Sequence, residues 1–243
     1  MRTRDLLTAL RPRQWAKNLL VLAAPLAAGQ LLEPGIFGPT VLAFVGFCLA
    51  SSAVYLVNDV HDRDADALHP TKSHRPIASG RVSPATAYVM ATVLALAALV
   101  LAALAGWSLL ALLAGYLFIQ VCYTLRLKHE PVLDLMVITA GFLMRAVAGG
   151  VASGLPISQW FLMVAGFGSL FVVAGKRYSE LHALGAASAT RRSLVRYTDS
   201  YLRFVWSMAA AACLMSYSLW AFDEGRADDN VPWHALSIAA LLT

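Results

Sequence analysis

Charged side chains are scarce in this chain, where Asp, Glu, Lys and Arg make up 14% of 243 residues and mean hydropathy is +0.64. Soluble domains carry charge on about a quarter of their residues, so the composition excludes an ordinary water-soluble fold. Cysteine is also rare, with three residues that lie singly in apolar stretches, and the six histidines show no metal-ligand spacing. The sequence therefore excludes a cysteine-based metal site or redox pair.

Long apolar segments dominate what is present. Segments of 17–25 residues can cross a hydrocarbon core of ~30 Å as helices. The first could also be a signal peptide, because basic residues precede it, but six further spans without a soluble domain favour a retained helix. The predicted spans are residues 17–33, 38–58, 85–105, 107–125, 132–152, 158–175 and 200–221. An eighth segment runs only from Trp233 to Thr243, so the C-terminus looks incomplete. We expect one all-α domain over residues 1–243, a polytopic transmembrane helix bundle.

Basic residues gather on one side of this predicted bundle. All Lys and Arg residues except Arg145 and Arg226 fall in the N-terminal segment or after the second, fourth and sixth spans. The positive-inside rule therefore predicts a cytoplasmic N-terminus in a multi-pass protein of the inner (plasma) membrane. The isoelectric point near 9.3 follows from this topology and is no sign of nucleic-acid binding.

The stretch NDVHDRDAD places four aspartates directly after the second span. If that helix continues beyond the membrane, Asn58, Asp62 and Asp66 form one stripe, Asp59 lies beside it, and Asp64 points away. Clustered oxygen ligands suit a hard cation, and Mg²⁺ takes one or two carboxylates together with substrate phosphates. An EF-hand loop is excluded because its Gly and Glu are missing. A solvated acidic cap is the alternative.

A basic loop follows the acidic stretch at once. The sequence HPTKSHRPIASGR supplies Lys72, Arg75 and Arg81, and its prolines and glycine favour an ordered loop. Lys and Arg beside a metal-holding stripe suit a diphosphate. The alternative is that the positive-inside rule alone explains these basic residues, and it accounts best for Arg81. Lys72 and Arg75 are therefore the predicted phosphate ligands.

Together these motifs resemble the UbiA superfamily of intramembrane transferases. NDVHDRDAD fits the family pattern N-D-x-x-D-x-x-x-D, R-P-I-A-S-G follows it, and YTLRLK ends the fourth span. The resemblance covers essentially the whole chain and implies nine helices around a central cavity, about eight of them seen here. It implies Mg²⁺ as cofactor, with Asp62, Asp66 and Asn58 as metal ligands and catalytic residues.

A departure from the family pattern points to the donor. Prenyl-diphosphate users carry a second motif, D-x-x-x-D, after the sixth span, where this chain reads VVAGKRYSELHAL. Bases in place of acids suit a donor with an additional phosphate. With RPRQWAKNLLVLAAP and VLDLMVITAGFLMRAVAGG, the chain resembles the branch that transfers 5-phosphoribose from phosphoribosyl pyrophosphate to decaprenyl phosphate, releasing pyrophosphate. That reaction serves synthesis of the arabinan precursor for cell-wall arabinogalactan.

Two other functions stay open at this stage: a prenyltransferase that moves a prenyl group from a prenyl diphosphate to an aromatic acceptor, and a non-enzyme such as a transporter. Membrane lipids are expected partners, and self-association is an open option. The resemblance implies these substrate-binding residues: Lys17, Asp59, Lys72, Arg75, Tyr123, Lys128, Lys176, Arg177 and Glu180.

Arg145 and Asp134 share one face of the fifth span, eleven residues apart. Arg145 could meet the acceptor's phosphate or support the cavity floor, because ionisable groups within the membrane usually face the bundle interior. It could also snorkel to the outer surface. Pairing with Lys128 is one option for Asp134.

Overall fold

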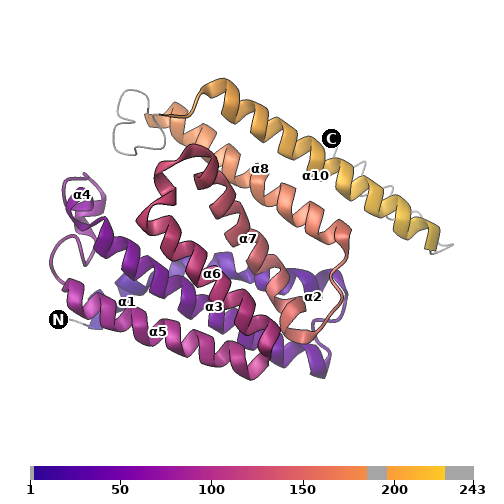
Figure 1. The fold of residues 1–243 in the computed structure, drawn as a ribbon, viewed down its shortest axis with the longest axis horizontal. Helices are drawn as coiled ribbons and strands as arrows, with labels where there is room; N and C mark the ends of the chain where they lie inside the picture. Colours follow the sequence, from indigo (N-terminus) through magenta and orange to yellow (C-terminus); the bar gives the residue numbers. More distant parts are fainter. Residues whose placement is uncertain (1–2, 185–195, 228–243) are drawn as a thin grey trace. The chain divides into compact units, whose positions relative to one another are not determined.

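The computed structural model describes residues 3–184 and 196–227, and every regular element within these ranges is a helix (Figure 1). Six of them are long and apolar enough to cross a membrane, which confirms the predicted all-α, multi-pass fold. They are α3 (Pro34–His61), α5 (Pro84–Ala105), α6 (Trp107–Leu125), α7 (Pro131–Ser153), α8 (Gln159–Leu184) and α10 (Asp199–Ala227). The predicted segment from Trp233 to Thr243 lies outside the described residues.

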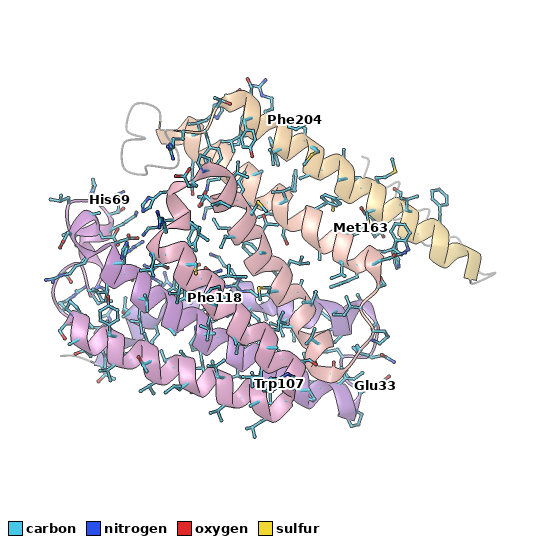
Figure 2. All side chains as sticks on the ribbon, viewed as in Figure 1. Glu33, His69, Trp107, Phe118, Met163 and Phe204 are labelled. Carbon is cyan, nitrogen blue, oxygen red and sulfur yellow. The ribbon has the colours of Figure 1, made fainter. Side chains whose placement is uncertain are left out.

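Proline and capping residues set the start of these helices. Pro34, Pro84 and Pro131 each occupy the first helical position, where a missing N–H costs nothing. Ser83 caps α5 by accepting a hydrogen bond from the backbone N–H of Thr86 at 3.1 Å. Large apolar side chains point away from the helices, as expected for surfaces that face lipid; Trp107 and Phe118 are 81% and 70% exposed (Figure 2).

The first predicted span, residues 17–33, was wrong as a single membrane-length helix. The chain instead forms a short helix α1 (Thr3–Leu10), a 3₁₀-helix η1 (Pro12–Leu22) and one turn of α-helix α2 (Ala23–Ala27). The helical stretch ends at Ala27, and Gly29 follows with φ 68°, a backbone conformation that a right-handed helix does not contain. Hydropathy reports only that this segment is apolar, and cannot show how its backbone is wound.

The 3₁₀-helix η1 is fixed along one edge to its neighbours. Trp15 Nε1 donates to Ser52 Oγ at 3.0 Å, and the buried Asn18 Nδ2 donates to Ser51 Oγ at 3.2 Å. Near its end, η1 approaches α7 so closely that a Cβ on Gly149 would lie 2.1 Å from the carbonyl oxygen of Val21. Only glycine permits this approach.

The chain divides into two compact units, each considered by itself: residues 1–137 with 144–156, and residues 138–143 with 157–243. In the first unit α3 packs against α5, α6, α1 and η1. Its core contains Phe47 stacked at a tilt on Tyr116, with ring centroids 5.1 Å apart. The expectation of one transmembrane domain stays a prediction.

In the second unit α8 and α10 lie side by side (Figure 1). Trp206 of α10 covers Gly175, where a Cβ would lie 2.8 Å from its indole nitrogen. Its ring stacks with Phe171 and Tyr178 at centroid distances of 5.6 and 5.5 Å. This aromatic stack fixes the two helices to each other beside the sequence KRYSE.

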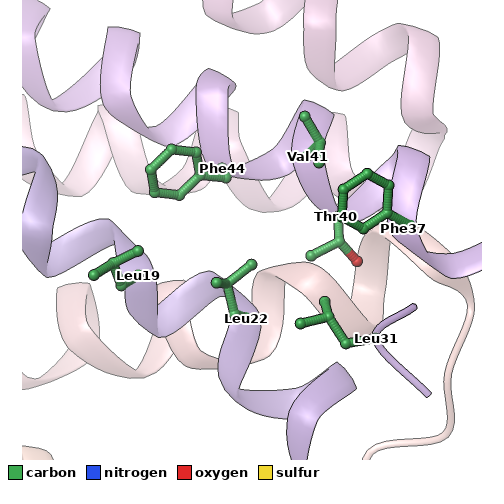
Figure 3. A pocket seen from close by; sticks show the side chains of 7 residues that line it. All are labelled: Leu19, Leu22, Leu31, Phe37, Thr40, Val41 and Phe44. Atoms are coloured by element: carbon green, nitrogen blue, oxygen red, sulfur yellow. The ribbon is translucent and has the colours of Figure 1, made fainter.

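An apolar groove lies between η1 and α3 in the first unit (Figure 3). Its volume is about 220 Å³. The hydroxyl of Thr40 donates to the carbonyl of Ile36 at 2.7 Å, so this wall offers the groove no free hydrogen-bond donor. The lining residues are Leu19, Leu22, Leu31, Phe37, Thr40, Val41 and Phe44.

Candidate functional site

The acidic stretch lies where α3 stops. The helix ends at His61, and Asp62 caps it with φ −93° and ψ 7° before the short helix α4 (Arg63–Ala67) begins. The prediction that α3 continues straight through the stretch was therefore wrong. The turn at Asp62 brings Asp66 back into the protein, where it is 3% exposed, as is Asp59. Asp64 is exposed, which agrees with the expectation that it points away.

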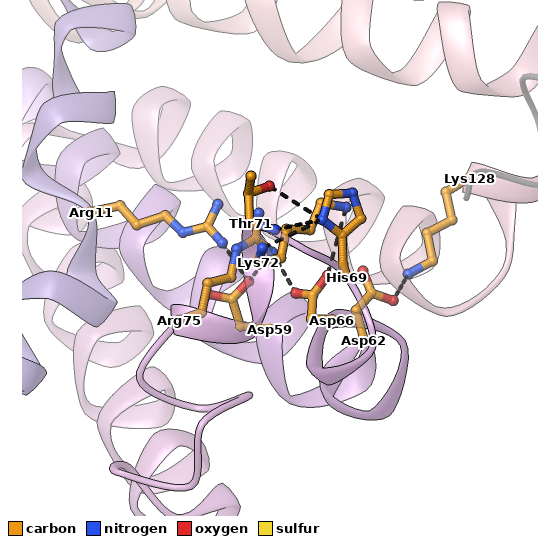
Figure 4. A network of polar contacts seen from close by, with 9 residues as sticks. All are labelled: Arg11, Asp59, Asp62, Asp66, His69, Thr71, Lys72, Arg75 and Lys128. Carbon is orange, nitrogen blue, oxygen red and sulfur yellow. Dashed lines mark hydrogen bonds and ion pairs between the residues drawn. The ribbon is translucent and has the colours of Figure 1, made fainter. Parts of the chain in front are cut away.

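One guanidinium joins the two buried carboxylates. Arg75 follows the 3₁₀ turn η2 (Lys72–His74), and its Nη1 lies 3.1 Å from Asp59 Oδ1 and 2.5 Å from Asp66 Oδ2 (Figure 4). A single nitrogen therefore stands where two carboxylates converge. The structure thus brings Asp59 and Asp66 together, whereas the sequence had grouped Asp62 with Asp66.

Three further bases contact the same set of carboxylates (Figure 4). Arg11 Nη2 is 2.5 Å from Asp59 Oδ1, and Lys72 Nζ is 3.6 Å from Asp66 Oδ1. Lys128, from the 3₁₀ turn η3 (Leu127–His129), places its Nζ 2.5 Å from Asp62 Oδ1. The predicted residues Lys72, Arg75 and Lys128 thus converge on the aspartates, and each carboxylate has a cationic partner.

Arg11 was missed by the sequence analysis, which treated it only as a charge that sets topology. It joins α1 to η1 with φ 54° and ψ 57°, and is the one non-glycine residue with positive φ among the residues described. Left-handed backbone of this kind is uncommon outside glycine and concentrates at functional sites. Its guanidinium also lies 4.9 Å from the ring centroid of Tyr55. No sequence motif announces such a backbone conformation.

The remaining sequence candidates in the first unit lie deeper or to one side. Tyr123 donates from its hydroxyl to Asp134 Oδ1 at 2.7 Å, and Asp134 is fully buried. Lys128, suggested as a partner of Asp134, lies on Asp62 instead. Asn58 is half-buried in the last turn of α3.

Arg145 lies in the interior of the first unit rather than at its outer surface, with 7% exposure. Its Nε donates to Asn18 Oδ1 at 2.8 Å, and its Nη2 donates to the hydroxyl of Tyr116 at 2.6 Å. The guanidinium also lies 4.9 Å from the centroid of the Tyr116 ring. The alternative of snorkelling to the outer surface was therefore wrong.

In the second unit, α8 carries the bases that replace the missing acidic motif. Arg177, which is 3% exposed, places Nη1 2.8 Å from Glu180 Oε2, and Lys176 Nζ lies 3.9 Å from Glu180 Oε1. One turn later His182 Nε2 lies 3.1 Å from Asp199 Oδ1 of α10. The three predicted residues thus form one cluster on α8.

A magnesium ion at the acidic site would need oxygen ligands from the aspartates. Within the part of the chain that the structure describes, no three His, Cys, Asp or Glu side chains converge as a complete metal cage. Asp59 and Asp66, however, already share one cationic nitrogen, and their oxygens are hard ligands of the kind that Mg²⁺ prefers. These residues fit an ion that completes its coordination with substrate phosphates.

Residues 19–241 match the family model described as the UbiA prenyltransferase family. The chain belongs to this family. It is 49% identical to the decaprenyl-phosphate phosphoribosyltransferase of Mycolicibacterium smegmatis over 96% of this chain and 77% of that protein. It is 48% identical to the protein of the same name from Corynebacterium glutamicum, over 96% of this chain and 72% of that one.

Solved UbiA structures share the fold. A UbiA homolog from Archaeoglobus fulgidus bound to DMAPP and Mg²⁺ superposes with a TM-score of 0.78 at 19% identity, covering 98% of this chain and 84% of that one. The family-model match confirms the resemblance of the sequence to the UbiA superfamily, and the likeness to this solved structure agrees with the helical membrane fold.

Proposed function

We propose that this UbiA-family chain transfers 5-phosphoribose from phosphoribosyl pyrophosphate to a polyprenyl phosphate, with decaprenyl phosphate as acceptor and pyrophosphate as product. The observation that carries the proposal is identity of 48–49%, over 95–96% of the chain, to proteins named decaprenyl-phosphate phosphoribosyltransferase. The bases Lys176 and Arg177 support it, because they stand where prenyl-diphosphate users have acids.

The pyrophosphate end of the donor binds at the aspartates of the α3–α4 turn. Asp62 and Asp66 would hold Mg²⁺, with Asn58 beside them and Asp59 added by its position next to Asp66. Bound there with the diphosphate, Mg²⁺ would neutralise the charge that develops on the leaving group. Arg75 and Lys72, which contact these carboxylates in the structure, would donate charge-assisted hydrogen bonds to the phosphate oxygens.

The rest of the donor involves the α8 cluster. Lys176 and Arg177 bind the donor's 5-phosphate, and Glu180 accepts hydrogen bonds from the ribose hydroxyls. Tyr123 and Lys128 border the diphosphate from α6 and η3. These assignments match basic side chains, which donate hydrogen bonds, with phosphate oxygens. They match the Glu180 carboxylate, which accepts hydrogen bonds, with the ribose hydroxyls.

The acceptor requires no base from the protein. A phosphate monoester has a second pKa near 6, so it is already an oxyanion at pH 7. The protein instead positions this oxyanion behind C1 of the ribose and excludes water. Attack on C1 forms the new C–O bond as the bond to pyrophosphate breaks, and the anomeric centre inverts.

The setting of the reaction follows from the charges of the loops. The bases cluster in the N-terminal segment and in alternate loops, and so the active site faces the cytoplasm of a cell with this chain in its plasma membrane. The water-soluble donor enters from that side. The lipid product serves as a precursor for arabinan in the cell wall.

The direct test uses purified protein with labelled phosphoribosyl pyrophosphate, Mg²⁺ and decaprenyl phosphate, followed by extraction of labelled lipid. Asp62→Asn and Asp66→Asn should nearly abolish product, since each replaces a charged ligand with a neutral amide of equal size. Asp64→Asn is the matched control in the same turn and should retain activity. Activity with a prenyl diphosphate and an aromatic acceptor, and none with the sugar donor, would replace this function by prenyl transfer.

A further inference from the structure

The buried carboxylate of Asp59 needs a cationic partner throughout the proposed reaction. Asp59 is 3% exposed, and both hydrogen bonds that it accepts within the described part of the chain, from Arg11 and Arg75, go to its Oδ1. Arg75 is the residue that turns toward the phosphate oxygens of the donor in the proposed function. Removing the partner of a buried carboxylate is strongly destabilising. A second cation must therefore stay on Asp59 when Arg75 binds phosphate.

The side chain of Arg11 is placed for this task along one face of α3. Tyr55 and Asp59 lie four residues apart in that helix, and so their side chains share a face. The Arg11 guanidinium lies 4.9 Å from the centroid of the Tyr55 ring, and its Nη2 lies 2.5 Å from Asp59 Oδ1 (Figure 4 shows the second contact). The ring and the carboxylate together fix the position of the guanidinium.

The backbone around Arg11 is held on both sides by Ser52 of α3. The Ser52 hydroxyl donates to the carbonyl of Leu10 at 2.8 Å and accepts from Trp15 Nε1 at 3.0 Å. Arg11 has φ 54° although Pro12 follows it, and residues before proline favour extended backbone. A conformation that is unfavourable in this way persists only where the surrounding structure holds it. The junction of α1 and η1 is thus fixed with Arg11 directed at the acidic site.

The other bases of the N-terminal segment do not share this position. The side chains of Arg4, Arg13 and Lys17 are exposed, including Lys17, which the sequence had predicted to bind substrate. Within residues 3–184 and 196–227, Arg11 is the base from this segment that forms an ion pair with Asp59. Its contact comes from the α1–η1 junction and does not depend on the loop that carries Arg75.

We propose that Arg11 is a positioning residue of the diphosphate site, which acts through Asp59 as the cation that stays on this carboxylate while Arg75 binds the diphosphate. Arg11 does not contact the donor. Without Arg11 the whole charge of Asp59 attracts Arg75, and the carboxylate then competes with the diphosphate for this guanidinium. The inference rests on the proposed function for the identity of the donor. It can be measured by binding of inorganic pyrophosphate, without turnover.

The test is a double-mutant cycle between Arg11→Gln and Asp59→Asn, with the purified protein in detergent and a fixed concentration of Mg²⁺. The measured quantity is the Kd for inorganic pyrophosphate. Arg11→Gln alone should raise this Kd by about tenfold, which is equivalent to about 1.4 kcal/mol. In the Asp59→Asn background the same change should have an effect of less than about twofold, because the carboxylate through which Arg11 acts is gone. Asp62 and Asp66 keep their charges in that background, so binding remains measurable.

Further variants separate the role of the Arg11 side chain from a role in folding. Arg11→Lys keeps a cation next to Asp59 and should bind pyrophosphate within about threefold of the wild type. Arg11→Gly suits the left-handed backbone, so it should unfold at a higher temperature than Arg11→Gln and yet weaken pyrophosphate binding as much. Arg13→Gln is the matched control, since it removes the charge of an exposed base of η1 and should leave the Kd within about twofold.

Equal losses from Arg11→Gln in both backgrounds would mean that Arg11 contacts the anion itself, and would overturn the positioning role. The same holds if Arg11→Gln and Arg13→Gln have equal effects, or if the wild type binds no pyrophosphate. The transfer assay separates these failures from that of the proposed function. A protein that shows the expected cycle but makes no phosphoribosyl lipid keeps the role of Arg11 and loses the reaction assignment. A protein that makes the lipid but shows equal losses in both backgrounds keeps the reaction assignment and loses the role of Arg11.

Discussion

Replacing Arg75 with leucine should make the protein bind Mg²⁺ more tightly, although it removes a residue of the candidate site. In the structure the Arg75 Nη1 occupies the point where Asp59 and Asp66 converge, at 3.1 and 2.5 Å. A metal ion that uses both carboxylates must first displace this nitrogen. Arg75 is therefore a competitor of the ion in the absence of substrate.

The size of the effect follows from the contacts that are displaced. A hydrogen bond to a charged group contributes ~1.5–3 kcal/mol, and the partly exposed Arg75 side chain favours the lower end. At 1.4 kcal/mol per tenfold change, the Kd for Mg²⁺ should fall about tenfold in Arg75→Leu. Without Mg²⁺ the variant should be less stable by about 2 kcal/mol, below the ~3–5 kcal/mol of a buried pair left unpartnered, because Arg11 and Lys72 still contact the same aspartates.

Thermal unfolding in detergent across a Mg²⁺ titration, with no substrate present, measures both effects. Stabilisation by a ligand grows as RT ln(1 + [L]/Kd), so saturating Mg²⁺ should raise the stability of Arg75→Leu by about 1.4 kcal/mol more than that of the wild type. Arg81→Leu is the control, an exposed arginine of the same loop that contacts Asp5 instead. Equal Mg²⁺ responses in all three proteins would refute a metal position between Asp59 and Asp66.

Topology, donor binding and helix packing each have a direct test. In a background without the native cysteines, Ser79→Cys should resist an impermeant thiol reagent that is added outside intact cells, whereas Ser158→Cys should react. The reverse pattern would invert the proposed orientation in the membrane. Lys176→Ala should raise the KM for the sugar donor by about ten- to a hundredfold and change the acceptor KM little, and a shift in the acceptor KM alone would move this base to the lipid phosphate. Gly149→Ala should lower the free energy of unfolding by about 1–3 kcal/mol because its methyl group meets the backbone of η1. Gly166→Ala is the control and should be tolerated, since a Cβ there has nothing within 4 Å. Equal unfolding temperatures for the two variants would contradict this packing.

Hydropathy was sufficient to predict the six long helices, because each is a long apolar run bounded by proline, glycine or charge. It failed for residues 17–33, where the backbone is wound as 3₁₀-helix up to Leu22, approaches Gly149 closely and turns at Gly29. Contacts between segments that are distant in the chain have no signature in local composition. A sequence window therefore reports that η1 is apolar and misses how it is wound.

The candidate site was predicted in composition but not in arrangement. The aspartates and the bases Lys72, Arg75 and Lys128 were found from their spacing and charge. Their pairing depends on the end of α3 at His61, since the turn there places Asp66 beside Asp59 rather than below Asp62. Arg11 was missed because its role depends on a left-handed backbone angle that no residue pattern required.

The 3₁₀ winding of η1 gives that segment a repeat of three. Side chains three residues apart stand directly above one another in such a helix, so Trp15, Asn18 and Val21 share the edge that touches α3 and α7. Adding or deleting one residue before Trp15 would turn that edge by about 120° and bring Lys17 or Leu19 against Arg145. Related chains should therefore vary in length here only by multiples of three, each multiple sliding the edge by about 6 Å without turning it.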